Sequence, residues 1–167
     1  AQEELISLYL EQNETLSSIL GQTVDVLDSL AYGPFSREEI QEIIAEVVII
    51  ISEVNKAITP AEVEEVSQAI VFNALAADID PYLLLSIAVT ESHCRPDIRG
   101  ESGEYGMMQV MPGTGAWIAG ELGYADYDPA QLLEIRANVQ YAAYYLRISI
   151  REFGGDVSKG LLAYNRG

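Results

Sequence analysis

One acidic residue, Glu91, stands where its side chain could donate a proton. On a helix that begins at Pro81, it follows Leu84 and Ile87 by seven and four residues, and it therefore extends their apolar face. It also lies near the end of that helix, where the helix dipole disfavours an anion. A carboxyl group in such a setting holds its proton more tightly than in water, as general acid catalysis requires. The alternative is a solvated glutamate at a helix end.

The composition of the chain leaves acid–base chemistry to its carboxylates. One Cys (Cys94) and one His (His93) are too few for an intramolecular disulfide or a Cys/His metal cluster, and we expect neither a metal nor a cofactor. Adjacent helical residues point about 100° apart, so we expect His93 to be an ordinary histidine and not a dyad partner of Glu91. A formal charge of −17 excludes the basic surface that nucleic acid requires.

Four sequence blocks that include Glu91 occur in order. The first is Glu91-Ser92, with a proline four residues after the serine. The others are GEYGMMQVMPGT from Gly103, NVQYAAYYL from Asn138 and AYNRG from Ala163. Together they resemble the blocks of the soluble lytic transglycosylase (SLT) domain, a goose-lysozyme-like family of peptidoglycan-cleaving enzymes. The resemblance covers residues from about 62 to 167.

The resemblance implies an all-α, lysozyme-like fold and a role for each matching residue. Glu91 is then the catalytic acid and base. Met108 is expected in the floor of the cleft and Gln109 in its wall. Tyr164 and Asn165 are expected to face the acid across the cleft, and Asn138 to be a structural or substrate-proximal amide. Each of three residues also has a simpler interpretation. Met108 is a typical core residue, Asn138 a possible helix N-cap and Tyr164 an ordinary packing tyrosine.

The implied reaction is cleavage of the β-1,4 bond between N-acetylmuramic acid and N-acetylglucosamine, with a 1,6-anhydro ring on the muramic acid. It uses one acid, because the family pattern requires none of the nearby Asp97, Glu101 and Glu104. Two alternatives stay open: a hydrolytic muramidase of the same fold, and a wall-docking component of a secretion system or phage particle with weak turnover. A peptidoglycan substrate implies a periplasmic, extracellular or virion location, although no signal peptide is visible.

Three positions depart from the family pattern. Gly100 stands where a serine is frequent, Cys94 where an aromatic residue is common, and Glu104-Tyr105 where small residues are usual. These differences affect substrate subsites and rate, and they leave the central acid in place.

The elements that would position this site are helices, because no segment alternates with the period of a strand. Helix starts are marked by Thr59 with Pro60 and Glu62, and by three further prolines, which predict helices over 81–91, over 112–123 and from 129. Another helix is predicted over 138–153, before Gly154. The stretch 95–111 has little helical period and three glycines, and long irregular segments of compact domains are often functional.

The first third of the chain is more acidic than the rest. Residues 1–65 carry 14 acidic and 2 basic side chains. We therefore expect an acidic helical module over 1–58, which could attract a basic protein partner, ahead of a catalytic domain over 59–167. Ser36 and Glu39 form a capping box that favours helix over strand for 47–51. The apolar residues of the module predict that it packs against the catalytic domain, and its longest apolar run is too short for a membrane span.

Overall fold

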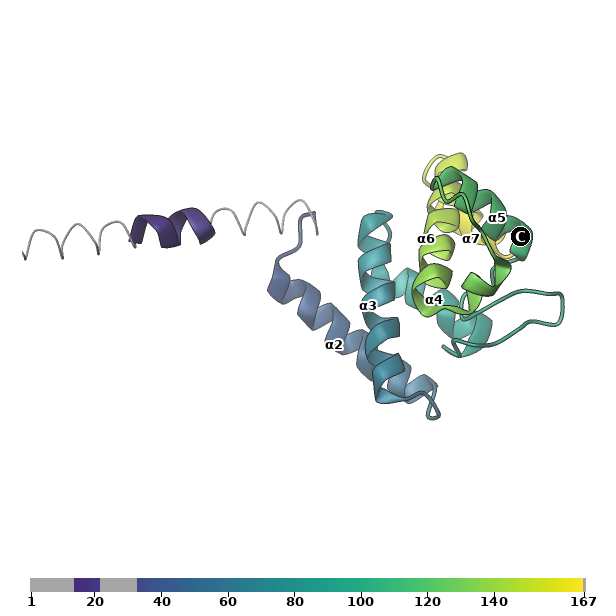
Figure 1. Cartoon of the computed structure of the whole chain (residues 1–167), viewed down its shortest axis with the longest axis horizontal. Helices are drawn as coiled ribbons and strands as arrows, with labels where there is room; N and C mark the ends of the chain where they lie inside the picture. Colours follow the sequence, from purple (N-terminus) through teal and green to yellow (C-terminus); the bar gives the residue numbers. More distant parts are fainter. Residues whose placement is uncertain (1–13, 22–32, 167) are drawn as a thin grey trace, which may run out of the picture. The chain divides into compact units, whose positions relative to one another are not determined.

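The structure is a computed structural model that describes residues 14–21 and 33–166. In these ranges all regular secondary structure is helical, apart from two isolated bridges that Tyr105 makes with Arg99 and Val110. A helical segment at 14–21 is followed by α2 (Arg37–Val54), α3 (Pro60–Ala76), α4 (Pro81–Ser92), α5 (Pro112–Glu121), the 3-10 helix η1 (Pro129–Leu133), α6 (Ile135–Glu152) and α7 (Val157–Tyr164) (Figure 1). The predicted all-α class is confirmed.

Backbone contacts divide the chain into two compact units, Ala1–Ile40 and Gln41–Gly167. In the described part of the first unit, the helical segment at 14–21 exposes Leu16, Ile19 and Leu20. The predicted apolar contacts of Leu5 and Leu8 lie outside the described residues. The domain boundary after residue 58 stays a prediction.

Two helix starts that the sequence predicted have the hydrogen bonds of capping side chains. The Glu62 backbone N–H donates to the Thr59 hydroxyl at 3.3 Å, and the Thr59 N–H donates to the Glu62 carboxylate at 2.9 Å. Asp80 caps α4 by accepting from the backbone N–H of Tyr82 at 2.7 Å. Such caps satisfy N–H groups that have no partner within their own helix, and they therefore fix where each helix begins.

The core of the second unit lies along α6, which is placed between α3 and α7 (Figure 1). Its buried face meets a buried face of α3, and the fully buried side chains are Val66, Ile70, Ala74, Val139, Ala142 and Leu146. Close approach of α7 depends on Gly160, because an added Cβ there would lie 2.9 Å from the Ile150 Cα. Ordinary Cβ contacts are longer, so a side chain at this position would push α7 away from α6.

α2 crosses the boundary between the two units, and from Gln41 on it belongs to the second. It buries Ile44, Val47 and Ile51, and the Tyr82 hydroxyl of α4 donates to the Glu46 carboxylate. The helical interpretation of 47–51 is confirmed, and this part of the predicted acidic module packs against the rest of the second unit. None of the described helices is long and apolar enough to cross a membrane.

Two helix boundaries differ from the sequence prediction. Asp128 and Pro129 do begin a helix, but it is the short 3-10 helix η1, which ends where Glu134 adopts an extended conformation with ψ 128°. The next helix begins at Ile135 and not at Asn138, so the interpretation of Asn138 as an N-cap is wrong. Glu134 takes the cap position, and its carbonyl accepts the first helical hydrogen bond, from the Asn138 N–H at 2.9 Å.

Candidate active site

Glu91 lies in the last turn of α4, and its side chain is half-buried. Burial raises the pKa of its carboxyl group above the ordinary 4.5, and the negative charge of Glu104 raises it further. Loss of water disfavours the charged form, and so does a nearby like charge. The direction of this pKa shift is the one that the sequence position of Glu91 predicted.

The chain leaves α4 through a rigid turn directly after Glu91. His93 and Cys94 both have a φ of 54°, and their backbone N–H groups donate to the carbonyls of Val89 and Ala88 at 3.0 and 3.1 Å. The buried Ser92 hydroxyl accepts from the Arg95 N–H at 3.1 Å. These bonds occupy the carbonyls at the end of the helix and hold Glu91 in one place.

His93 and Cys94 themselves do not face the site as reactive groups. The His93 side chain is exposed, as the sequence prediction of an ordinary histidine requires. Cys94 is buried, and burial raises the pKa of its thiol to about 11, which disfavours the reactive thiolate. Its carbonyl accepts from the Asn55 side chain at 3.1 Å, so this position ties the loop after α2 to the end of α4.

The segment before α5 folds back on itself around Tyr105. Tyr105 and Val110 exchange backbone hydrogen bonds of 2.9 and 3.1 Å, and the Gly106 N–H donates to the Ile98 carbonyl at 2.8 Å. Gln109 has a φ of 52°, which is uncommon for a residue other than glycine. Its side-chain amide donates to the Gly106 carbonyl at 2.8 Å. Gln109 is thus a strained residue held within its own loop, and strained residues of this kind occur mostly at functional sites.

Asn138 holds this loop against α6. Its side-chain oxygen accepts from the Met108 N–H at 2.7 Å, and its amide donates to the Tyr105 carbonyl at 2.9 Å. An added Cβ at Gly106 would overlap the Asn138 side chain and the Leu132 carbonyl, so only glycine permits this approach. Asn138 exposes 1% of its surface. Its contacts are those of a structural amide.

Tyr164 closes the site from α7. It is buried, and its hydroxyl donates to the Met108 carbonyl at 2.8 Å. Burial raises the pKa of this phenol, and so does the nearby charge of Glu91, which places Tyr164 close to the acid. Met108 is completely buried, and both of its backbone polar groups are bound. Met108 therefore supports the floor of the site from inside the core. Asn165, the C-cap of α7, is exposed.

A small hollow brings two predicted residues together, Gln109 and Tyr164. Its other lining residues are Val110, Met111, Thr114 and Tyr145. Behind Tyr145, the ring of Trp117 makes an edge-to-face contact at 6.3 Å between centroids, and 44% of Trp117 is exposed. An exposed aromatic ring beside a hollow with a few polar groups offers an apolar face that suits sugar rings.

The chain matches the family model described as the transglycosylase SLT domain, over residues 68–167. The chain belongs to the SLT domain family. Among curated proteins, it is 34% identical to a soluble lytic murein transglycosylase of Salmonella typhimurium, over 54% of this chain and 14% of that protein. It is 36% identical to a transglycosylase of Enterobacteria phage PRD1, over 54% of this chain and 30% of that protein. The chain thus matches only a small part of each relative's length.

Solved structures show the same fold at low sequence identity. A lytic transglycosylase of Pseudomonas aeruginosa superposes with a TM-score of 0.57 at 22% identity, over 81% of this chain and 24% of that one. The 70-kDa soluble lytic transglycosylase of Escherichia coli gives 0.57 at 18% identity, over 92% of this chain and 27% of that one. The predicted lysozyme-like helical fold and family membership are therefore confirmed.

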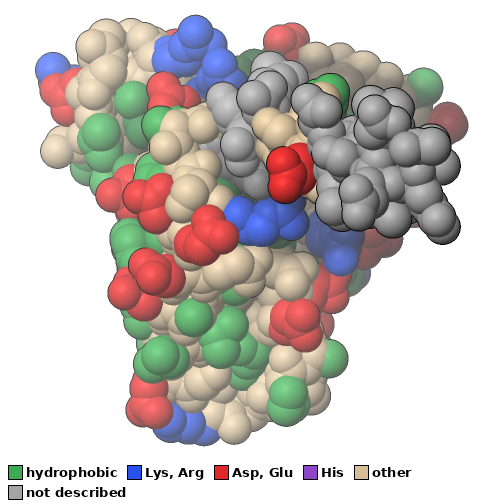
Figure 2. Space-filling view, turned by 90° about the vertical axis from the view of Figure 1, so that its left-hand side faces the viewer, with side chains coloured by type: hydrophobic (Ala, Val, Ile, Leu, Met, Phe, Trp, Pro, Cys, Tyr) green, Lys and Arg blue, Asp and Glu red, His purple; other side chains and the backbone are tan. Residues whose placement is uncertain are grey.

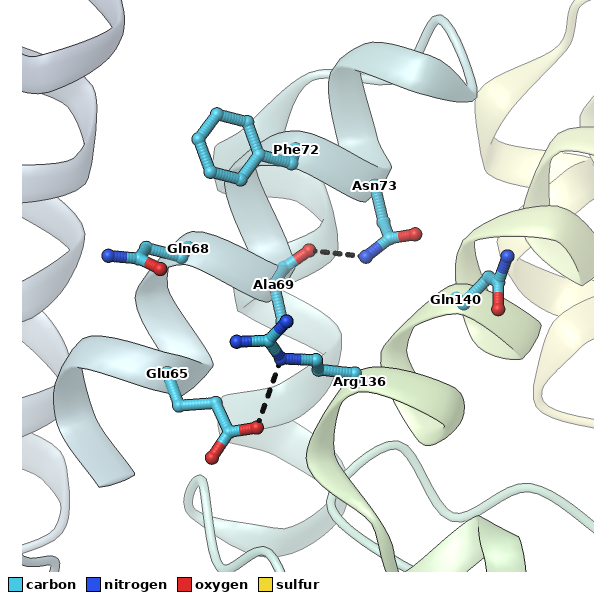
Figure 3. Close-up of a pocket in the computed structure, with 7 residues that line it drawn as sticks. All are labelled: Glu65, Gln68, Ala69, Phe72, Asn73, Arg136 and Gln140. Carbon is cyan, nitrogen blue, oxygen red and sulfur yellow. Dashed lines mark hydrogen bonds and ion pairs between the residues drawn. The ribbon is translucent and has the colours of Figure 1, made fainter. Parts of the chain in front are cut away.

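A larger hollow of the SLT domain, of about 320 Å³, lies elsewhere, between α3 and α6 (Figure 3). Its lining consists of Glu65, Gln68, Ala69, Phe72, Asn73, Arg136 and Gln140, and it includes none of the predicted site residues. Its carboxylate is already paired, since Glu65 accepts from the Arg136 guanidinium at 3.2 Å. The hollow therefore offers no unpaired carboxylate.

Sequence reasoning gave no role to several residues that the SLT fold brings to the site. Thr114, Tyr145 and Glu104 lie inside the matching blocks, which was the available signal, whereas Trp117 carried none. Within the described ranges, no group of three His, Cys, Asp or Glu side chains could hold a metal ion. On the described part of the face in Figure 2, acidic side chains are spread over the surface and do not gather in one patch.

Proposed function

We propose that this chain is a peptidoglycan lytic transglycosylase with Glu91 as its single acid and base. The supporting observation is a half-buried carboxyl group with a raised pKa, placed near Tyr164 at the site of an SLT domain. The proposed substrate is the β-1,4 bond between N-acetylmuramic acid and N-acetylglucosamine, and the proposed product carries a 1,6-anhydro ring.

In the first step, protonated Glu91 gives its proton to the glycosidic oxygen, and the bond from that oxygen to the muramic acid C1 breaks. The carbonyl oxygen of the substrate's acetamido group bonds to C1 and shares the positive charge. The neutral Tyr164 phenol does not compete for the proton, because burial and the bond to the Met108 carbonyl hold it un-ionised.

In the second step, the Glu91 carboxylate takes the proton of the muramic acid C6 hydroxyl. The C6 oxygen then bonds to C1 and displaces the acetamido oxygen, and Glu91 is protonated again. No water is consumed. A water molecule in place of the C6 hydroxyl would give the hydrolytic product of a muramidase.

The wall of the site supplies binding groups for the glycan. We expect the sugar next to the cleaved bond to contact Gln109, Thr114 and Tyr145, and the strand to continue over the exposed ring of Trp117. Asn165 follows Tyr164 at the exposed end of α7 and is a further candidate contact. Such a substrate places the activity in the periplasm, outside the cell or on a virion, and residues 1–58 remain a proposed site for a basic partner.

Mass spectrometry of material released from purified peptidoglycan tests the proposal. The expected main products end in 1,6-anhydro-N-acetylmuramic acid. Products with a reducing muramic acid would instead identify a hydrolase. Binding without any release would identify a wall-docking component.

A further inference from the structure

Glu104 lies in a tight loop that points its carboxylate back over Gly100. The Gly100 N–H donates to the Glu104 carbonyl at 2.8 Å, and the Gly103 N–H donates to the Gly100 carbonyl at 3.3 Å. The Glu104 carboxylate also accepts from the Ser102 backbone N–H at 3.1 Å. The loop therefore holds the carboxylate in a defined direction.

The absence of a side chain at Gly100 makes room for this carboxylate beside Gln109. A Cβ added at Gly100 would overlap one carboxylate oxygen of Glu104 and the side-chain oxygen of Gln109. Both oxygens therefore occupy the space that a side chain at position 100 would fill. Because Gln109 lines the hollow together with Tyr164, the Glu104 carboxylate lies next to one of the residues that form the wall of this hollow.

Glu104 differs from the other two acids of this segment in its burial and in its effect on the pKa of Glu91. Asp97 and Glu101 are exposed, whereas Glu104 is half-buried, and its charge adds to burial in raising the pKa of Glu91. From α7, the titratable group that faces Glu91 is the neutral Tyr164 phenol. Glu104 therefore supplies the negative charge that opposes ionisation of Glu91.

We propose that Glu104 is a second carboxylate of this active site, a positioning residue that keeps the proton on Glu91 until the glycosidic bond is cleaved. The inference rests on the proposed function. Glu104 neither gives nor takes a proton in either step. Before cleavage its charge favours the protonated Glu91, and after cleavage the same charge makes the Glu91 carboxylate a stronger base toward the C6 hydroxyl.

The test compares Glu104→Gln with Glu101→Gln, which removes an equal charge from an exposed position of the same loop. The rate at limiting substrate is measured against pH on soluble glycan strands. In Glu104→Gln the alkaline fall of kcat/KM should move to lower pH, because fewer Glu91 carboxyls stay protonated. For each pH unit by which the fall moves, kcat/KM at pH values above the fall decreases about tenfold. Glu101→Gln should keep the wild-type profile, and Glu104→Asp should restore part of it.

A second measurement follows Glu91 without substrate. In protein labelled with 13C at the glutamate carboxyls, the Glu91 signal is assigned by its loss in Glu91→Gln and then titrated. Its midpoint should fall in Glu104→Gln and not in Glu101→Gln.

Four outcomes decide between the alternatives. An unmoved midpoint, or a KM increase with an unmoved pH profile, would overturn the proposal. A lowered midpoint together with a lowered alkaline fall would support it. A lowered midpoint in a chain whose wild type releases nothing from peptidoglycan would refute the proposed function, and it would leave the effect of Glu104 on Glu91 established.

Discussion

Two hollows of the second unit, the one between α3 and α6 and the one beside Tyr164, differ in what their polar groups already do. Between α3 and α6, the one carboxylate is exposed and paired with a guanidinium, and the hollow is the larger of the two. Beside Tyr164, the hollow is small, but burial and the charge of Glu104 raise the pKa of the nearby Glu91 carboxyl group. A carboxyl group whose pKa is raised by burial is a better indication of catalysis than an open volume is.

The largest expected effect is on peptidoglycan cleavage, and it distinguishes Glu91 from the acid at the α3–α6 hollow. Glu91→Gln should fold and lose at least about 100-fold in peptidoglycan cleavage, because an amide keeps the shape but delivers no proton. Glu65→Gln, at the α3–α6 hollow, should keep the wild-type rate. Release of soluble muropeptides by the purified variants measures both. Near-wild-type release by Glu91→Gln would remove this residue from the mechanism.

A second difference concerns stability. Asn138→Ala leaves the Met108 N–H and the Tyr105 carbonyl without their partners, and each unsatisfied buried group costs about 1–3 kcal/mol. We expect a loss of about 2–5 kcal/mol in the free energy of unfolding, measured with urea. Gln140→Ala, on the same helix at the other hollow, should change it by less than about 1 kcal/mol. Equal losses in the two variants would contradict the structural role of Asn138.

A third prediction concerns pH. The folded-state pKa of Glu91 lies above its unfolded value, so ionisation of this residue opposes folding: wild-type stability is lowered progressively as pH rises from about 4.5 through the folded pKa. Glu91→Gln lacks this penalty, and it should exceed the wild type in stability at neutral pH. The difference should vanish below the unfolded pKa. Thermal melts at several pH values provide the measurement, and a variant less stable than wild type at neutral pH would contradict the assigned direction.

The smallest expected effect compares two exposed aromatic rings. Trp117→Ala should raise KM for long glycan strands about 3- to 10-fold, as expected for loss of about 0.5–1.5 kcal/mol of ring contact, and leave kcat nearly unchanged. Phe72→Ala, at the α3–α6 hollow, should change neither constant. A larger effect at Phe72 would move the glycan path to the other hollow.

Local signals in the sequence predicted much of this fold. Thr59 and Asp80 mark helix starts because a cap bonds to backbone groups two or three residues away, and such a bond needs no distant partner. The start of α6 was missed because the extended Glu134 ends η1 and caps the next helix, and its neighbours give no comparable signal.

The site was predictable only where the family blocks extend. Glu91, Gln109, Tyr164 and Asn138 were named from those blocks, and the structure brings them to one region. The sequence did not distinguish Glu104 from Asp97 and Glu101, because their directions depend on how the loop folds over Gly100. The complete burial of Met108 likewise depends on the packing of distant helices.

The Tyr164 hydroxyl reaches back to the Met108 carbonyl from a helix that follows most of the domain in sequence. During synthesis, Tyr164 joins the chain 73 residues after Glu91. At about 5–20 residues per second, this delay is about 4–15 s. During that interval, α4 can form with its acid in place, while the side of the site that Tyr164 and α7 provide is still missing. The order of translation therefore makes this side of the site the last to be completed, when α7 docks.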